Sequence, residues 1–98
     1  MTSFKNNGKL KLLIIVGTRP EIIRLAEGVT VLPRAVVNTG CTVCRGCIIN
    51  CGAIVDHGCT LEEGVHLAPG AIVKAENRIP ACTKVDSGEV IANRTYPL

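Results

Sequence analysis

The strongest constraint on the fold of this chain is a six-residue repeat. Every sixth residue is aliphatic in eleven consecutive positions. A period of six matches neither the 3.6-residue turn of an α-helix nor the two-residue alternation of a surface strand. It is typical of a β-helix built from hexapeptides. The positions are Val31, Val37, Val43, Ile49, Val55, Leu61, Leu67, Val73, Ile79, Val85 and Ile91.

The repeat predicts a three-sided prism with aliphatic columns inside it. One hexapeptide supplies one short strand and one turn, so three of them complete a coil that rises by about 4.8 Å. A small residue often stands four positions after the aliphatic one, and a glycine often precedes it, where its tolerance of positive φ suits a corner. The predicted columns are Val31, Ile49, Leu67, Val85; Val37, Val55, Val73, Ile91; and Val43, Leu61, Ile79.

Residues 1–27 are predicted to form a separate cap. Residues 1–9 are mostly polar, so we expect them to be frayed. Leu10–Val16 reads as a buried strand and Gly17–Glu21 as a turn. A short helix should follow and end near Gly28, with Ile22, Ile23 and Ala26 on its apolar face. We therefore predict a strand–loop–helix cap over residues 1–27 and a β-helix over residues 28–98.

The sequence of this cap resembles a known enzyme family. Residues 13–24, Leu-Ile-Ile-Val-Gly-Thr-Arg-Pro-Glu-Ile-Ile-Arg, are similar to the first strand, loop and helix of non-hydrolysing UDP-N-acetylglucosamine 2-epimerases. The resemblance implies that Arg19 and Arg24 contact a nucleotide sugar. It covers only about 27 residues, and the acidic and histidine catalytic residues of that family have no counterpart here. A nucleotide-sugar binding fragment is therefore one alternative, and a purely structural cap is another.

The repeat region resembles a second family. Residues 28–74 look like the carboxy-terminal β-helix of sugar O- and N-acetyltransferases of the sialic-acid and bacillosamine-precursor type. The stretches from Ala35 to Gly40 and from Cys47 to Ala71 carry the likeness. The resemblance implies a left-handed coil, acetyl-CoA as acyl donor and a sugar or nucleotide-sugar acceptor. It also implies a homotrimer in which each active site lies between neighbouring subunits.

Three site residues follow from this second resemblance. It implies that His57 is the general base for the attacking sugar hydroxyl or amine, that His66 lies beside the acetyl group and acetyl-CoA, and that Asn50 lines the site. A neutral imidazole can accept a proton at working pH. His57 and His66 are nine residues apart, which is half a coil. They should face different sides of one prism and share a site only across a subunit contact.

The chain departs from the acetyltransferase pattern at two points. The family usually follows its base with an acidic residue that orients the ring, whereas this chain has Gly58. Asp56 and Glu62 are the two candidates that could orient His57 instead. The family's amino-terminal domain for the nucleotide sugar also has no counterpart. A catalytically inactive trimeric β-helix remnant is therefore a further alternative.

The spacing of four cysteines resembles that of iron–sulfur ligands, but their positions in the six-residue repeat argue against such a cluster. Cys41, Cys44, Cys47 and Cys51 copy an iron–sulfur ligand spacing. In the hexapeptide register, however, Cys41 and Cys47 occupy the small-residue position, and an extended chain would not bring the four sulfurs together. The two histidines are too few for a zinc site with three histidine ligands. We predict no metal site.

Composition and short segments restrict the remaining functions. A net charge of +3 with almost no aromatic residues gives no reason to expect nucleic-acid binding. The apolar run Leu12–Val16 is too short to cross a membrane. No targeting segment is recognisable, so we expect a cytoplasmic protein.

Two features of the repeat bear on the surface and the last coil. Aliphatic side chains just before the inward position should face outward and mark a subunit interface, namely Ile48, Ile54, Ile72 and Val90. Asn77 and Glu89 break the small-residue rule. We therefore expect the last coil to be looser and residues 93–98 to leave the prism as a polar tail.

Overall fold

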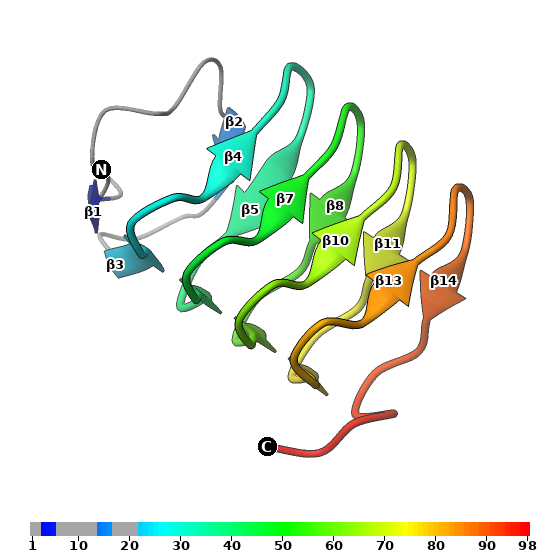
Figure 1. Cartoon of the computed structure of the whole chain (residues 1–98). Coiled ribbons are helices and arrows are strands. Elements are labelled where there is room, and N and C mark those ends of the chain that lie inside the picture. Colours follow the sequence, from blue (N-terminus) through cyan, green and yellow to red (C-terminus); the bar gives the residue numbers. More distant parts are fainter. Residues whose placement is uncertain (1–2, 6–13, 17–21) are drawn as a thin grey trace.

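The chain folds as a left-handed parallel β-helix of about four turns, which confirms the predicted fold (Figure 1). The computed structural model describes residues 3–5, 14–16 and 22–98. Within these ranges every paired strand runs parallel to its neighbours, and no helix is present. The described residues accordingly contain no helix that is long and apolar enough to cross a membrane.

The strands stack into three flat faces, which we call A, B and C. Face A contains β1 (Ser3–Lys5), β3 (Ile22–Leu25), β6 (Thr42–Val43), β9 (Thr60–Leu61) and β12 (Arg78–Ile79). Face B contains β2 (Ile14–Val16), β5 (Val36–Asn38), β8 (Ile54–Val55), β11 (Ile72–Val73) and β14 (Val90–Ile91). Face C contains β4 (Thr30–Val31), β7 (Ile48–Ile49), β10 (His66–Leu67) and β13 (Lys84–Val85).

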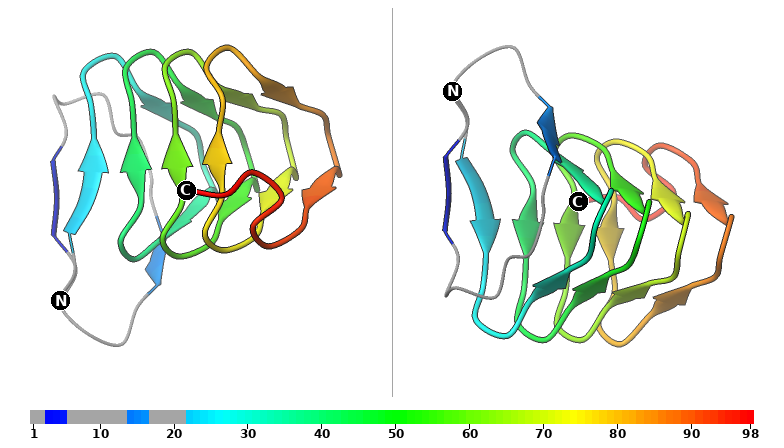
Figure 2. Two further views of the ribbon diagram at one scale, coloured as in Figure 1. Left: turned by 90° about the horizontal axis from the view of Figure 1, so that it is seen from below. Right: turned by 90° about the horizontal axis from the view of Figure 1, so that it is seen from above.

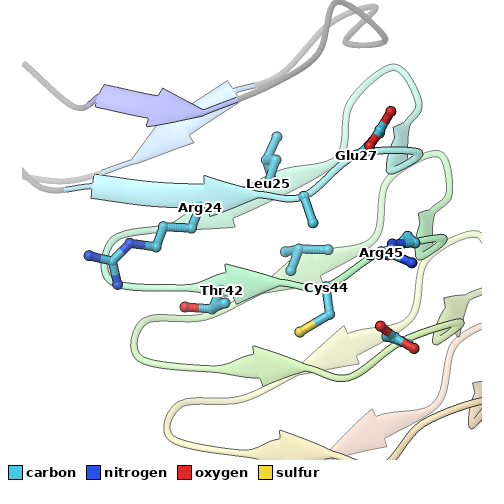
Figure 3. Close-up of a pocket in the computed structure, with 9 residues that line it drawn as sticks. Arg24, Leu25, Glu27, Thr42, Cys44 and Arg45 are labelled. Atoms are coloured by element: carbon cyan, nitrogen blue, oxygen red, sulfur yellow. The ribbon is translucent and has the colours of Figure 1, made fainter.

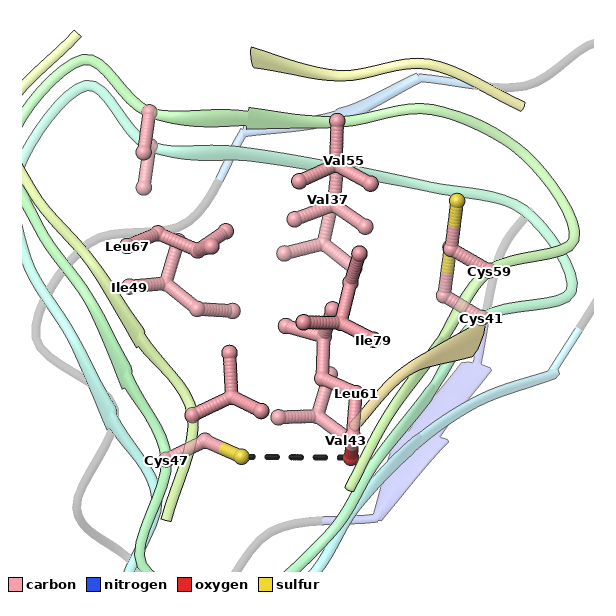
Figure 4. Packing of buried hydrophobic residues seen from close by; sticks show 14 of the residues in the cluster. Val37, Cys41, Val43, Cys47, Ile49, Val55, Cys59, Leu61, Leu67 and Ile79 are labelled. Atoms are coloured by element: carbon pink, nitrogen blue, oxygen red, sulfur yellow. Dashed lines mark hydrogen bonds between the residues drawn. The ribbon is translucent and has the colours of Figure 1, made fainter. Parts of the chain in front are cut away.

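The three predicted columns of aliphatic side chains form the core (Figure 4). Val43 lies in register with Leu61 on face A, Val55 with Val73 on face B and Ile49 with Leu67 on face C. All six side chains are fully buried. Burying each one stabilises the fold by roughly 1.5–3 kcal/mol. Strands of only two residues are enough to hold the coils together, because the backbone of each coil also forms hydrogen bonds with the next coil.

The corners keep one backbone geometry whether or not they carry glycine. Gly52 and Gly70 have φ of 69° and 75°. The non-glycine residues at equivalent corners also have positive φ: Arg34 (68°), Glu76 (61°), Cys82 (61°) and Arg94 (53°). This conformation costs a residue with a Cβ about 1–2 kcal/mol. The coil therefore imposes the corner, and the loss of glycine toward the end of the chain does not open it.

The predicted amino-terminal helix is wrong where the structure describes it. Ile22–Leu25 is strand β3, and Leu25 pairs in register with Val43 of face A. Leu25 stands six residues before Val31, so the aliphatic repeat begins one hexapeptide earlier than we assigned it. Its side chain is only 4% exposed, because it extends the inward column. The inward column of the β-helix therefore extends back to Leu25.

Of the other predictions for the amino-terminal segment, one is confirmed in part and one is wrong. Ile14–Val16 of the predicted strand Leu10–Val16 forms β2 and pairs with β5. Ser3–Lys5 belongs to the segment predicted to be frayed, yet it forms β1 and pairs with β3. Leu10–Leu13 and the predicted turn at residues 17–21 lie outside the described residues.

The expected polar tail does not leave the prism. The last residues turn back beside the final coil (Figure 2), and the Arg78 N–H donates to the Tyr96 carbonyl at 2.7 Å. Asn77 is fully buried, and its Nδ2 donates to the carbonyls of Lys74 and Ala92 at 2.9 Å each. Its Oδ1 accepts the Tyr96 N–H at 2.8 Å. Asn77 therefore secures the end of the last coil to the coil before it.

We predict that Asn77→Ala lowers the free energy of unfolding by about 1–3 kcal/mol, because it leaves buried backbone groups without partners. Urea denaturation followed by circular dichroism measures the change. Asn93→Ala is the matched control, because Asn93 is exposed at a corner. Equal stability of the two variants would contradict the role assigned to Asn77.

Candidate active site

His57 lies at the corner where the chain passes from face B to face A, just after β8. Its side chain is 56% exposed, so a reactant can reach the ring. Its Nδ1 is 3.2 Å from Oδ1 of Asp56. The same oxygen accepts the backbone N–H of His57 at 2.7 Å. Nε2, the other ring nitrogen, makes no hydrogen bond with the part of the chain that the structure describes.

Asn38 supports Asp56 from the preceding coil. Its Nδ2 donates to Oδ1 of Asp56 at 3.1 Å, and its own Oδ1 accepts the Thr39 N–H at 2.7 Å. Partial desolvation raises the pKa of the Asp56 carboxyl. Hydrogen bonds from the His57 backbone, the His57 ring and Asn38 outweigh it, so the pKa lies below its usual value. Asp56 is therefore an ionised carboxylate at neutral pH.

The structure separates the two candidates for orienting His57. Glu62 is engaged elsewhere, because its Oε2 accepts from Nε of Arg78 at 2.5 Å. A third carboxylate, Glu76, lies over Gly58, but its Oε1 accepts from Nε of Arg94 at 2.7 Å. Among the described residues, Asp56 is the carboxylate that contacts the ring.

The other two predicted site residues lie elsewhere on the prism. His66 is on face C, in register between Ile48 of β7 and Lys84 of β13. Its Nε2 is shielded from solvent and has no hydrogen-bond partner in the described part of the chain. Asn50 directly follows β7, one coil before His66, and its Oδ1 accepts the Cys51 N–H at 2.7 Å. A single chain therefore does not bring His57 together with His66 and Asn50.

Arg24, which the epimerase resemblance singled out, lines a surface pocket of about 670 Å³ (Figure 3). The pocket lies over β3 and β6 of face A, with Arg24 and Arg45 at opposite ends and Glu27 and Glu63 also on its lining. Arg19 lies outside the described residues. This pocket escaped sequence reasoning, because the outward position of Arg24 is evident only once the repeat is extended to Leu25.

The cysteine side chains point in different directions, as the hexapeptide register predicted. Cys41, Cys47 and Cys59 point inward (Figure 4). Their Sγ atoms donate to carbonyls of the next coil: Cys41 to Asp56 at 2.9 Å, Cys47 to Glu62 at 3.0 Å and Cys59 to Lys74 at 3.1 Å. Cys51 is instead exposed at a corner. The described residues contain no cluster of three or more metal-ligating side chains.

The thiols of Cys41 and Cys47 are held in their protonated form. Burial raises the pKa of the Cys47 thiol to about 11. The side-chain contact with Cys59 raises the pKa of the Cys41 thiol. Since the thiolate is both the nucleophile and the metal ligand, Cys41 and Cys47 serve as small core residues.

Comparison with known proteins identifies no relative: no family model, no curated protein and no solved structure matches this chain.

We predict that Cys41, Cys47 and Cys59 resist alkylation by iodoacetamide at pH 8, because all three side chains are buried and the thiolates of Cys41 and Cys47 are also disfavoured. Exposed Cys82 is the internal reference and should react first. Peptide mapping by mass spectrometry follows each thiol, in buffer and in urea. Alkylation of Cys47 as fast as that of Cys82 in buffer would contradict the packing described above.

Proposed function

We propose that this chain is the subunit of an acyltransferase that moves an acetyl group from acetyl-CoA to a hydroxyl or amine of a sugar or nucleotide sugar. The observation that carries the proposal is the exposed ring of His57, whose Nδ1 is 3.2 Å from an ionised Asp56. The ring lies at an exposed corner of the β-helix. This fold is compatible with an acyltransferase of hexapeptide repeats.

In the proposed reaction His57 Nε2 removes the proton from the acceptor hydroxyl or amine. The acceptor atom attacks the thioester carbonyl, and backbone N–H groups at a coil edge stabilise the oxyanion. The carbon–sulfur bond then breaks, and the imidazolium returns the proton to the leaving thiolate of coenzyme A. His66, which is half-buried on face C, lies beside the acetyl group and acetyl-CoA in this proposal. Asn50 lines the proposed site.

We also propose that the working form is a homotrimer, and the composition of the faces supports it. The outward residues just before the inward column are all aliphatic on face B: Val36, Ile54, Ile72 and Val90. Ile54 and Val90 are 37% and 51% exposed. The equivalent residues on face A are polar: Arg24, Thr42, Thr60 and Arg78. Ile48, the fourth aliphatic residue that we expected to mark the interface, lies on face C and not on face B.

These faces favour one arrangement of the three subunits. Face B of one subunit packs against face C of the next, and the corner between C and B, which carries Cys51, points toward the threefold axis. Polar face A then faces solvent. His57, at the outer edge of face B, meets His66 on face C of the neighbouring subunit, so the subunit contact completes the site.

A second candidate function rests on the pocket beside Arg24. Two arginines at its ends suit the phosphates of a nucleotide sugar, although Glu27 and Glu63 line it too. Binding of UDP-N-acetylglucosamine that Arg24→Ala abolishes would favour this function. Calorimetry on the two proteins measures it.

We predict that His57→Asn lowers the rate of acetyl transfer by about 10²–10⁴-fold, since it removes the general base. Release of coenzyme A is measured by chromatography, because exposed Cys51 and Cys82 would themselves react with a thiol reagent. A panel of amino sugars and their nucleotide derivatives serves as acceptors.

The matched control for this experiment is His66→Asn, which should raise KM for acetyl-CoA more than it lowers the chemical step. Acetyl transfer at an unchanged rate in His57→Asn would contradict the proposal. If the protein is a trimer but neither binds acetyl-CoA nor transfers its acetyl group, it is the inactive β-helix remnant.

We predict a trimeric mass in solution, and cross-linking through Cys51 but not through Cys82. Cys82 lies at the corner between faces A and C, far from the proposed axis. A short bismaleimide should cross-link the subunits of the Cys82→Ser variant, which keeps Cys51. The Cys51→Ser variant should give no cross-linked subunits. Light scattering supplies the mass. A monomer, or products that depend on Cys82, would contradict the arrangement.

A further inference from the structure

Asp56 accepts from two residues at once, and its position determines the state of the His57 ring. Its Oδ1 lies 3.2 Å from His57 Nδ1, and the Asn38 amide donates to the same oxygen at 3.1 Å from one coil away. A carboxylate can only accept at this position, so a hydrogen bond with Nδ1 requires that the proton be on Nδ1. Nε2 of the neutral ring then carries a lone pair.

The backbone around His57 is fixed from both sides. The Gly58 N–H donates to the Thr39 carbonyl at 3.0 Å, and the His57 carbonyl accepts the Glu76 N–H at 3.1 Å. With the backbone held, only the two side-chain torsions of His57 are free, and the ring is too exposed for packing to fix them. A hydrogen bond to the ring is therefore what can orient it.

We propose that Asn38 and Asp56 are positioning residues for His57: the Asn38 amide holds the Asp56 carboxylate, which keeps the imidazole protonated on Nδ1 and directs Nε2 outward. The catalytic consequence rests on the proposed function, but the tautomer does not. Position 58 is glycine, so the residue after His57 has no side chain that could orient the ring. It depends on the stacking of Asn38 below Asp56, which are 18 residues apart.

The other carboxylates near His57 are paired with arginines, so Asp56 is the one that can orient the ring. Glu76 lies over Gly58 in the next coil, but Arg94 engages its carboxylate. Glu62 follows on face A and is paired with Arg78. The lowered pKa of Asp56 keeps its carboxylate ionised at neutral pH, as the hydrogen bond to Nδ1–H needs.

The test compares Asp56→Asn with Asn38→Ala and with Glu62→Gln as the matched control. Asp56→Asn keeps an oxygen that can accept the His57 backbone N–H, so the corner should survive; circular dichroism and melting curves check the fold. Long-range proton–nitrogen NMR spectra of labelled protein report the tautomer of each ring. The spectrum of His57→Asn assigns the two histidines, and His66 is the internal reference.

We expect His57 to be mainly protonated on Nδ1 in the parent protein, and this preference to be reduced in Asp56→Asn, whose neutral amide oxygen is a weaker acceptor than the carboxylate, and in Asn38→Ala. Glu62→Gln should leave it unchanged. The kcat for acetyl transfer should fall roughly 10–100-fold in Asp56→Asn with little change in KM, since ring orientation is only part of the contribution of a general base.

The outcomes separate this inference from the proposed function. A His57 ring protonated on Nε2 in the parent protein, or a tautomer that Asp56→Asn does not change, would overturn the positioning role even if acetyl transfer is observed. An Nδ1 tautomer that depends on Asp56 in a protein without transferase activity would support the positioning role and contradict the proposed function.

Discussion

The structure depends on the packing of each coil against the next through three aliphatic columns. No coil has a core of its own, because its inward residues are buried by those of its neighbours. Parallel backbone hydrogen bonds between coils keep this stacking in register. The columns therefore determine more than stability: they place every residue directly over the one that stands eighteen positions earlier, on the outside of the prism as well as inside it.

That register explains the surroundings of His57. Asn38 reaches Asp56 because the two occupy the same place on successive coils. Glu76 lies over Gly58 for the same reason. An exposed ring on a rigid corner can be oriented by such cross-coil contacts without a buried pocket. It also lacks the enclosing walls that many active sites have, which is why the proposed reaction needs a neighbouring subunit.

The sequence was sufficient to predict the core residues, but not where the repeat begins. Eleven aliphatic positions predicted the three columns, because burial leaves little choice of residue at a six-residue period. The membership of Leu25 is harder to see in the sequence, because Val29, a larger residue than alanine or cysteine, stands at the small-residue position after it. Asn77 breaks the repeat in the sequence, and its structural role follows only from its hydrogen bonds to Lys74, Ala92 and Tyr96, which the spacing does not reveal. The choice of Asp56 over Glu62 depended on side-chain torsions, which no spacing encodes.

The coil geometry also restricts how a protein of this kind can change in length. Removing one hexapeptide anywhere would leave the inward pattern intact, yet it would rotate all later residues by a third of a turn around the prism. A deletion between His57 and His66 would thus carry His66 from face C to another side, although every coil would still close. Only the gain or loss of a whole coil keeps distant residues on their original faces of the prism. The fold should therefore tolerate the insertion of single hexapeptides far more readily than a functional site whose residues come from several coils.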